Sequence, residues 1–195
     1  MKYILILLYI IFHSVSQVFA SKPPCIDNAY VNLRNGKYEI AQNILESCII
    51  NDSLNPPQKA YAYNILSQIS YRKDDLQKAI EYGTKALNIE HKNLKVMLAS
   101  CNALGVFYKA QCNYSKAKRY YYKGLEMIQW HDTNSKLALK KSNFHSNLIN
   151  IYRREGKIDS ALIFGEKAIA YSSKIDDERA LVSAFNNMAI VYQTI

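Results

Sequence analysis

A small side chain recurs along this chain at a nearly fixed interval, and this recurrence constrains the fold more than any other feature. The residues are Ala41, Ala79, Ala117 and Ala161. They lie 38, 38 and 44 residues apart. A second small side chain follows seven residues after each of them, at Cys48, Ala86, Gly124 and Ala168. Four copies of one spacing predict an array of stacked units in which each unit buries its neighbour's small residues.

The third copy indicates what one unit looks like. Residues 104–125 have the sequence LGVFYKAQCNYSKAKRYYYKGL, in which apolar and small residues recur at steps of three or four on both sides of a polar break at 111–113. This spacing predicts two amphipathic helices folded back on each other. Small side chains at Gly105 and Ala117 would let these two helices approach closely.

The same stretch resembles the tetratricopeptide repeat (TPR), whose pattern is L-G-x2-Y followed by A-x3-F. Here Leu104, Gly105 and Tyr108 stand in the first half of that pattern, and Ala117 and Tyr121 stand in the second. The resemblance implies an all-α fold, a right-handed α-solenoid of antiparallel helix pairs. The proline that usually closes each repeat is absent, and the period exceeds 34 residues, so the curvature of the superhelix is expected to differ from the standard one.

The array is expected to fill a single domain, residues 21–195. The predicted repeats are 25–50, 58–89, 94–129 and 135–173, followed by a partial repeat at 177–195. The partial repeat has only its first helix, which leaves an apolar face uncovered, so we expect the natural protein to continue beyond this chain. A composition of 49% hydrophobic and 21% charged residues, with 6 Gly and 4 Pro, fits a helical protein better than a disordered or fibrous one.

Residues 1–20 have the layout of a secretory signal peptide. A single cation at Lys2 precedes an apolar run over 3–12, and Val18-Phe19-Ala20 supplies a small-residue cleavage site. The alternative is an uncleaved anchor over 3–19, a marginal membrane span. Cleavage after Ala20 predicts an exported protein of the periplasm or cell envelope.

Export changes how the excess of cations is interpreted. The full chain has 25 Lys and Arg against 16 Asp and Glu, a formal charge of +9. Loss of residues 1–20 removes one cation and no acid, which leaves 24 minus 16, or +8. Outside the cytoplasm this charge favours an acidic peptide, an envelope polyanion or a membrane face over nucleic acid. An ordinary solvated surface is the alternative, because the cations are spread along the chain.

Four cysteines in an oxidising compartment raise the question of pairing. In an antiparallel helical hairpin with its turn at 35–36, Cys25 and Cys48 would face each other, so either a disulfide or two reduced core thiols fits these positions. Cys101 and Cys112 cannot pair if one helix carries both, since 11 residues at 1.5 Å separate them by about 16 Å. They are expected to be core thiols.

Motifs for catalysis are missing from the sequence. His91, His131 and His145 are too widely spaced for a local metal set, and no nucleophile, zinc or phosphate-binding motif occurs. Asp74-Asp75 and Asp176-Asp177-Glu178 fit carboxylates at helix starts. We therefore expect no cofactor, no metal and no enzymatic activity for this chain.

A second line of residues at i, i+4 and i+7 follows the predicted first helices. Its members are Asn64, Gln68, Tyr71; Asn102, Val106, Lys109; Ser146, Asn150, Arg153; Asn186, Ile190 and Gln193. The resemblance to TPR proteins implies that first helices line a concave groove, so this line would face a ligand. Asparagine amides can hold a peptide backbone, and Lys109, Arg153 and Arg154 could receive carboxylates. Ordinary solvated helix residues are the alternative.

Two classes of function remain open. One is an exported module that binds a protein or peptide, and its sequence resembles the N-terminal TPR region of bacterial signalling proteins of the Bacteroidota type. In that case a missing C-terminal segment would associate with the membrane and carry a histidine kinase or another output domain. The alternative is the solenoid part of an exported enzyme, or of a protein that binds glycans or small molecules. Fold analogy alone does not choose between them.

Overall fold

The computed structural model describes residues 23–89, 92–131, 137–175 and 178–194, and every regular element in these ranges is a helix. The helices are α2 (Pro24–Arg34), α3 (Tyr38–Ile50), α4 (Pro56–Arg72), α5 (Leu76–Asn88), α6 (Leu94–Ala110), α7 (Tyr114–His131), α8 (Ala138–Arg154), α9 (Ile158–Ser172) and α10 (Glu178–Tyr192). The predicted signal peptide, and the alternative anchor, lie outside the described residues.

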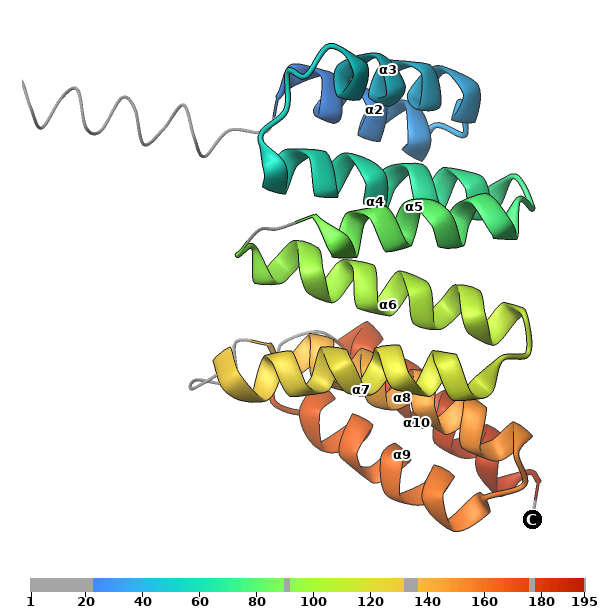
Figure 1. Ribbon diagram of the computed structural model, residues 1–195. Helices are drawn as coiled ribbons and strands as arrows, with labels where there is room; N and C mark the ends of the chain where they lie inside the picture. The colour runs from blue at the N-terminus through green and yellow to red at the C-terminus, as the bar shows by residue number, and fades with distance from the viewer. Residues whose placement is uncertain (1–22, 90–91, 132–136, 176–177, 195) are drawn as a thin grey trace, which may run out of the picture.

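Consecutive helices pair and the pairs stack in chain order (Figure 1). The pairs are α2 with α3, α4 with α5, α6 with α7, and α8 with α9, while α10 packs against both α8 and α9. The first helices of successive pairs also touch, α4 against α6 and α6 against α8. The predicted fold class, an all-α solenoid of helix pairs, is confirmed.

Polar residues at the helix starts fix where several helices begin. Asn55 and Gln58 form a reciprocal capping box at the start of α4, in which each side chain bonds the other's backbone N–H. The side chains of Asp75, Asn93 and Asn113 accept hydrogen bonds from the backbone N–H three residues further on. Because the first N–H groups of a helix have no partner within it, these caps favour the predicted breaks between helices.

The turns inside the four helix pairs share one geometry. Gly36, Asp74, Cys112 and Gly156 all have positive φ, from 57° to 73°. In each turn the next residue's N–H bonds a carbonyl five residues back, at 2.9 Å, as in a Schellman motif. Cys112 therefore lies in an exposed turn, so its prediction as a core thiol was wrong. Cys101, by contrast, is fully buried.

The recurring small residues form the contacts inside each pair. Ala41, Ala79, Ala117 and Ala161 are all fully buried. In the third pair, a Cβ on Gly105 would lie 2.2 Å from the Tyr121 ring, so only glycine allows α6 and α7 to approach this closely. The alanine-centred stacking deduced from the sequence is therefore present in the structure.

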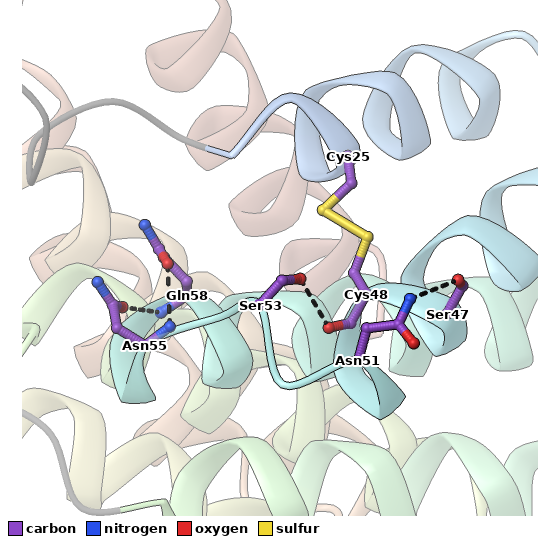
Figure 2. The surroundings of a disulfide bond; sticks show 7 residues. All are labelled: Cys25, Ser47, Cys48, Asn51, Ser53, Asn55 and Gln58. Atoms are coloured by element: carbon purple, nitrogen blue, oxygen red, sulfur yellow. Dashed lines mark hydrogen bonds between the residues drawn. A yellow bond between two sulfur atoms is a disulfide. The ribbon is translucent and has the colours of Figure 1, made fainter.

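A disulfide between Cys25 and Cys48 joins the start of α2 to the end of α3 (Figure 2). Their Cα atoms lie 6.7 Å apart. Ser53, in the loop that follows α3, donates a hydrogen bond to the Cys48 carbonyl, and this loop leads into the capping box of α4. The bridge closes the first helix pair at its open end, opposite the turn at Gly36.

Candidate functional site

The larger of two neighbouring hollows lies where α4, α6 and α8 meet, and we call it the wide cavity. Its volume is about 800 Å³. The last turn of α4, the middle of α6 and the first turns of α8 form its walls. Four of the predicted groove residues, Gln68, Tyr71, Asn102 and Val106, line it.

The second hollow, the narrow cavity, lies toward the C-terminal ends of the same three helices. Its volume is about 370 Å³. Three further predicted residues line it, Lys109, Asn150 and Arg154. Tyr71 and Val106 border both hollows, so the two cavities form one continuous groove along the first helices.

The groove is concave along α6 because this helix presents small side chains to it. These residues are Ala99, Ala103, Val106 and Ala110. Their spacing, i, i+4, i+7 and i+11, places them on one face of α6. Only Val106 belonged to the predicted line, although the same spacing was visible in the sequence. Lys140 and Asn143 of α8 also border the groove and were not predicted.

The groove carries an excess of positive charge. Among the described residues that line it, the charged side chains are Arg72, Lys109, Lys140, Arg154 and Asp74. Four cations against one acid leave a net charge of +3. None of the four cations forms an ion pair with a residue in the described part of the chain.

Lys109 is a half-buried cation in the wall of the narrow cavity. Burial lowers its pKa, and the nearby charge of Arg154 lowers it further. Its Nζ lies 3.5 Å from Asn147 Oδ1, a weak contact, and Asn147 in turn donates to Asn102 Oδ1 at 3.1 Å. A half-buried ammonium beside a second cation is a place where an incoming carboxylate would be stabilised.

Six predicted groove residues lie outside the two cavities. Asn64 is only 2% exposed and donates to the Val96 carbonyl and to Ser100 Oγ, so it ties α4 to α6. The others are Ser146, Arg153, Asn186, Ile190 and Gln193. Ser146 accepts a bond from Asn150 through its backbone carbonyl. Arg153 is half-buried, and its Nε has no hydrogen-bond partner among the described residues. Asn186 borders a separate hollow on α10.

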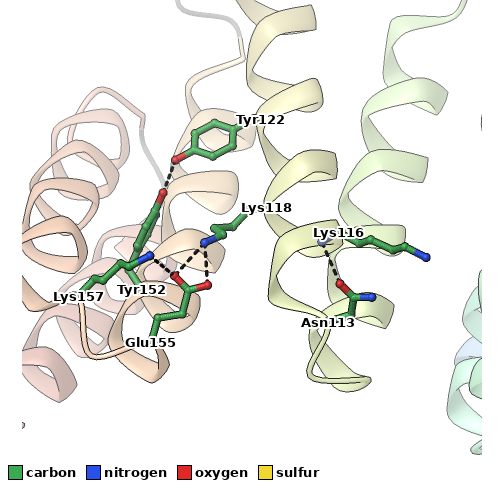
Figure 3. A network of polar contacts seen from close by, with 7 residues as sticks. All are labelled: Asn113, Lys116, Lys118, Tyr122, Tyr152, Glu155 and Lys157. Atoms are coloured by element: carbon green, nitrogen blue, oxygen red, sulfur yellow. Dashed lines mark hydrogen bonds and ion pairs between the residues drawn. The ribbon is translucent and has the colours of Figure 1, made fainter.

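Glu155 follows Arg154 in the sequence but pairs with Lys118 and Lys157 (Figure 3). Glu155 accepts two hydrogen bonds from Lys118 Nζ of α7, at 2.7 and 2.8 Å, and pairs with Lys157 at 3.2 Å. These bonds, that to Lys118 first, lower the pKa of Glu155. Beside them, the hydroxyls of Tyr122 and Tyr152 are hydrogen-bonded at 2.8 Å. This network joins α7 to α8 and leaves Arg154 without its neighbour's carboxylate.

The described part of the chain contains no group of three or more His, Cys, Asp or Glu residues that could hold a metal ion. No helix in these ranges is long and apolar enough to cross a membrane.

Stacked helix pairs with small residues at the pair contacts and a groove along the first helices define a TPR-like solenoid, and solved structures agree. BtubC from P. vanneervenii has a TM-score of 0.74 and 22% identity, over 85% of this chain and 69% of its own. A putative kinesin light chain from Podosopora anserina with TPR-like repeats gives 0.67 and 17%, over 87% and 84%. YrrB, described as a TPR protein with an unusual peptide-binding site, gives 0.57 and 18%, over 94% and 82%.

Comparisons of sequence alone give no relatives. No protein-family model matches the chain, and no curated protein matches it either. At identities of 17 to 22%, the solved structures establish the fold and nothing more.

Proposed function

We propose that this solenoid binds an extended, acidic segment of another protein in the groove formed by the wide and narrow cavities. The observation that carries the proposal is a set of four cations that line a concave surface and form no ion pair with any described residue, beside one acid among the described lining residues. Charge complementarity steers an acidic partner to such a surface and fixes its register. The description of YrrB as a peptide-binding TPR protein is compatible with the same use of the fold.

The groove has the dimensions of a short extended peptide. From Lys140 to Arg154, α8 spans 14 residues, or about 21 Å at 1.5 Å per residue. An extended chain advances about 3.3 Å per residue, so about six residues fit along this length. The amide side chains of Gln68, Asn102 and Asn150 border it and can both donate to and accept from a peptide backbone.

Charge reversal at the narrow cavity tests this proposal. The probe is a fluorescein-labelled ten-residue peptide with Asp at alternate positions in a Ser and Gln background, and binding is measured by fluorescence anisotropy. We expect the double variant Lys109→Glu/Arg154→Glu to weaken binding at least thirtyfold at low salt, since two attractive charges become repulsive. The control variant, Lys95→Glu/Arg119→Glu, makes the same change of charge on exposed side chains outside both cavities.

The two variants separate groove binding from attraction by overall charge. A loss confined to the groove variant supports the proposal. Equal losses in the two variants, or unchanged affinity in the groove variant, would overturn it. Replacing each Asp of the peptide by Asn should also reduce binding to wild-type protein by a similar factor.

We further propose that the chain is exported before it binds. The layout of residues 1–20 supports this, and so does the disulfide between Cys25 and Cys48, because such bonds persist mainly in oxidising compartments. Expression with residues 1–195 in a bacterial host should give a periplasmic protein whose N-terminus, by mass spectrometry, is Ser21. Retention of Met1 in a cytoplasmic product would overturn export.

We also propose a sensory role in a longer membrane signalling protein. This part of the proposal rests on the sequence resemblance alone. An antibody against the solenoid should detect, in the membrane fraction of the source cells, a protein clearly larger than the 22.4 kDa of this chain. A band of that size or smaller in the soluble fraction would overturn it.

A further inference from the structure

We infer that the groove selects a two-part motif, a large apolar side chain in the wide cavity and an acidic side chain about three residues away at Lys109 and Arg154. The inference rests on the proposed function and adds the specificity of the site. The two cavities are continuous, but different side chains line them. We therefore assign one part of the motif to each cavity.

The wide cavity is suited to an apolar and preferably aromatic side chain. Its floor is formed by Ala99 and Ala103, which leave the space that larger residues would fill. Phe107 and Phe144 also line it, and the Tyr71 ring packs on Phe107 with centroids 5.1 Å apart. Tyr71 is 38% exposed, so part of its ring remains open to an incoming aromatic group.

The narrow cavity is suited to an acid instead. Among its described lining residues the charged ones are Lys109 and Arg154, with no acid between them. The wide cavity, by contrast, has Asp74 beside Arg72 and Lys140. The acidic half of a ligand is therefore drawn toward the C-terminal ends of α6 and α8, and the apolar half is left for the wide cavity.

The spacing of the motif follows from α6, which borders both cavities. Ala103 lies in the floor of the wide cavity and Lys109 in the wall of the narrow one. Six residues of helix separate them, or about 9 Å at 1.5 Å per residue. About three residues of an extended peptide cover this distance at 3.3 Å each.

Peptide probes test the motif directly. Two fluorescein-labelled ten-residue peptides of Ser and Gln each carry one Phe and one Asp three positions apart, one with Phe first and one with Asp first. By anisotropy, we expect the better of the two to bind at least tenfold more tightly than its Phe→Ser derivative and at least tenfold more tightly than its Asp→Asn derivative. Reducing the spacing to one residue should give a similar loss.

A protein variant assigns the apolar half to the wide cavity. Ala103→Leu places a larger side chain in its floor, so we expect the Phe peptide to bind no better than its Phe→Ser derivative, while the dependence on Asp persists. Ala170→Leu is the matched control, because it adds the same side chain at an exposed position on α9. Its affinities should equal those of the wild-type protein.

The outcomes separate this inference from the proposed function. If Asp matters to the wild-type protein and Phe does not, the two-part motif is overturned and the acidic-peptide function stands. If neither matters, both are overturned. If Ala103→Leu leaves the preference for Phe intact, the wide cavity is not the apolar subsite. The peptide changes leave the protein untouched, so they decide the motif even if this variant fails to fold.

Discussion

Replacing Gly105 by alanine tests the helix contact on which the whole stack depends. Gly105 lies inside α6, where alanine is normally the better helix former by about 1 kcal/mol. At this position the added Cβ would lie 2.2 Å from Cε1 of Tyr121 and 2.6 Å from two further ring atoms. Tyr121 is fully buried, and its ring packs against Phe144 with centroids 6.2 Å apart.

The expected loss of stability follows from the distance that the Tyr121 ring must move. Ordinary van der Waals contact of a Cβ begins at 3.4 Å, so the Tyr121 ring has to retreat by about 3.4 minus 2.2, or 1.2 Å. Overpacking a close-packed core by one methyl group costs about 1–3 kcal/mol, and displacement of a whole buried ring belongs at the upper end. After the gain in helix propensity, we expect a net loss of about 2 kcal/mol, or a fall in Tm of about 4–8 °C.

Urea unfolding followed by circular dichroism at 222 nm measures this loss. Gly83→Ala is the matched control, since it is also a buried helix-interior glycine, but its Cβ would meet the flexible end of Leu104 at 3.0 Å. We expect it to change stability by less than 1 kcal/mol. A Gly105→Ala protein as stable as the wild type would refute the close approach of α6 and α7.

Three further predictions concern the turn, the disulfide and pH. Cys112→Gly should raise stability by about 1 kcal/mol in urea unfolding, because glycine adopts the positive φ of 57° without strain. Cys25→Ser should lower stability by about 3 kcal/mol, since the bond to Cys48 closes a loop with a sequence separation of 23, and hydrogen exchange should show the loss mainly in α2 and α3. Burial, helped by two nearby lysines, lowers the pKa of His145 to about 4, below its unfolded value of 6.5. The unfolded state therefore binds the proton more readily, and stability should fall by about 3 kcal/mol as pH drops from 6.5 to 4, whereas His145→Phe should flatten this slope.

The sequence indicated the array because its signals are local and repeated. Ala79, Ala117 and Ala161 are fully buried, as the spacing predicted, because a helix places residues three, four and seven apart on one face whatever lies beyond it. The sequence also indicated the turns within the pairs. Gly36 and Gly156 occupy a left-handed backbone position that Asp74 and Cys112 occupy in the other two copies.

Of the residues predicted to face a ligand, Gln68, Tyr71, Asn102, Val106, Lys109, Asn150 and Arg154 line the two cavities, whereas Asn64, Ser146, Arg153, Asn186, Ile190 and Gln193 do not. Asn64 and Gln68 lie four residues apart on α4, yet one is buried against α6 and the other is exposed. Sequence spacing gives the face of a helix, and the packing angle of its neighbours decides how much of that face is covered.

The amino-acid order by itself determined that this chain is all-α, how its helices pair and where the pairs turn, because each of these depends on residues within about forty positions of one another. Only the tertiary structure decided which side chains share a cavity. Tyr71, Val106 and Arg154 come from three different helix pairs, and their meeting depends on the rise and rotation between pairs, which are summed from many side-chain contacts and are not encoded in any single segment.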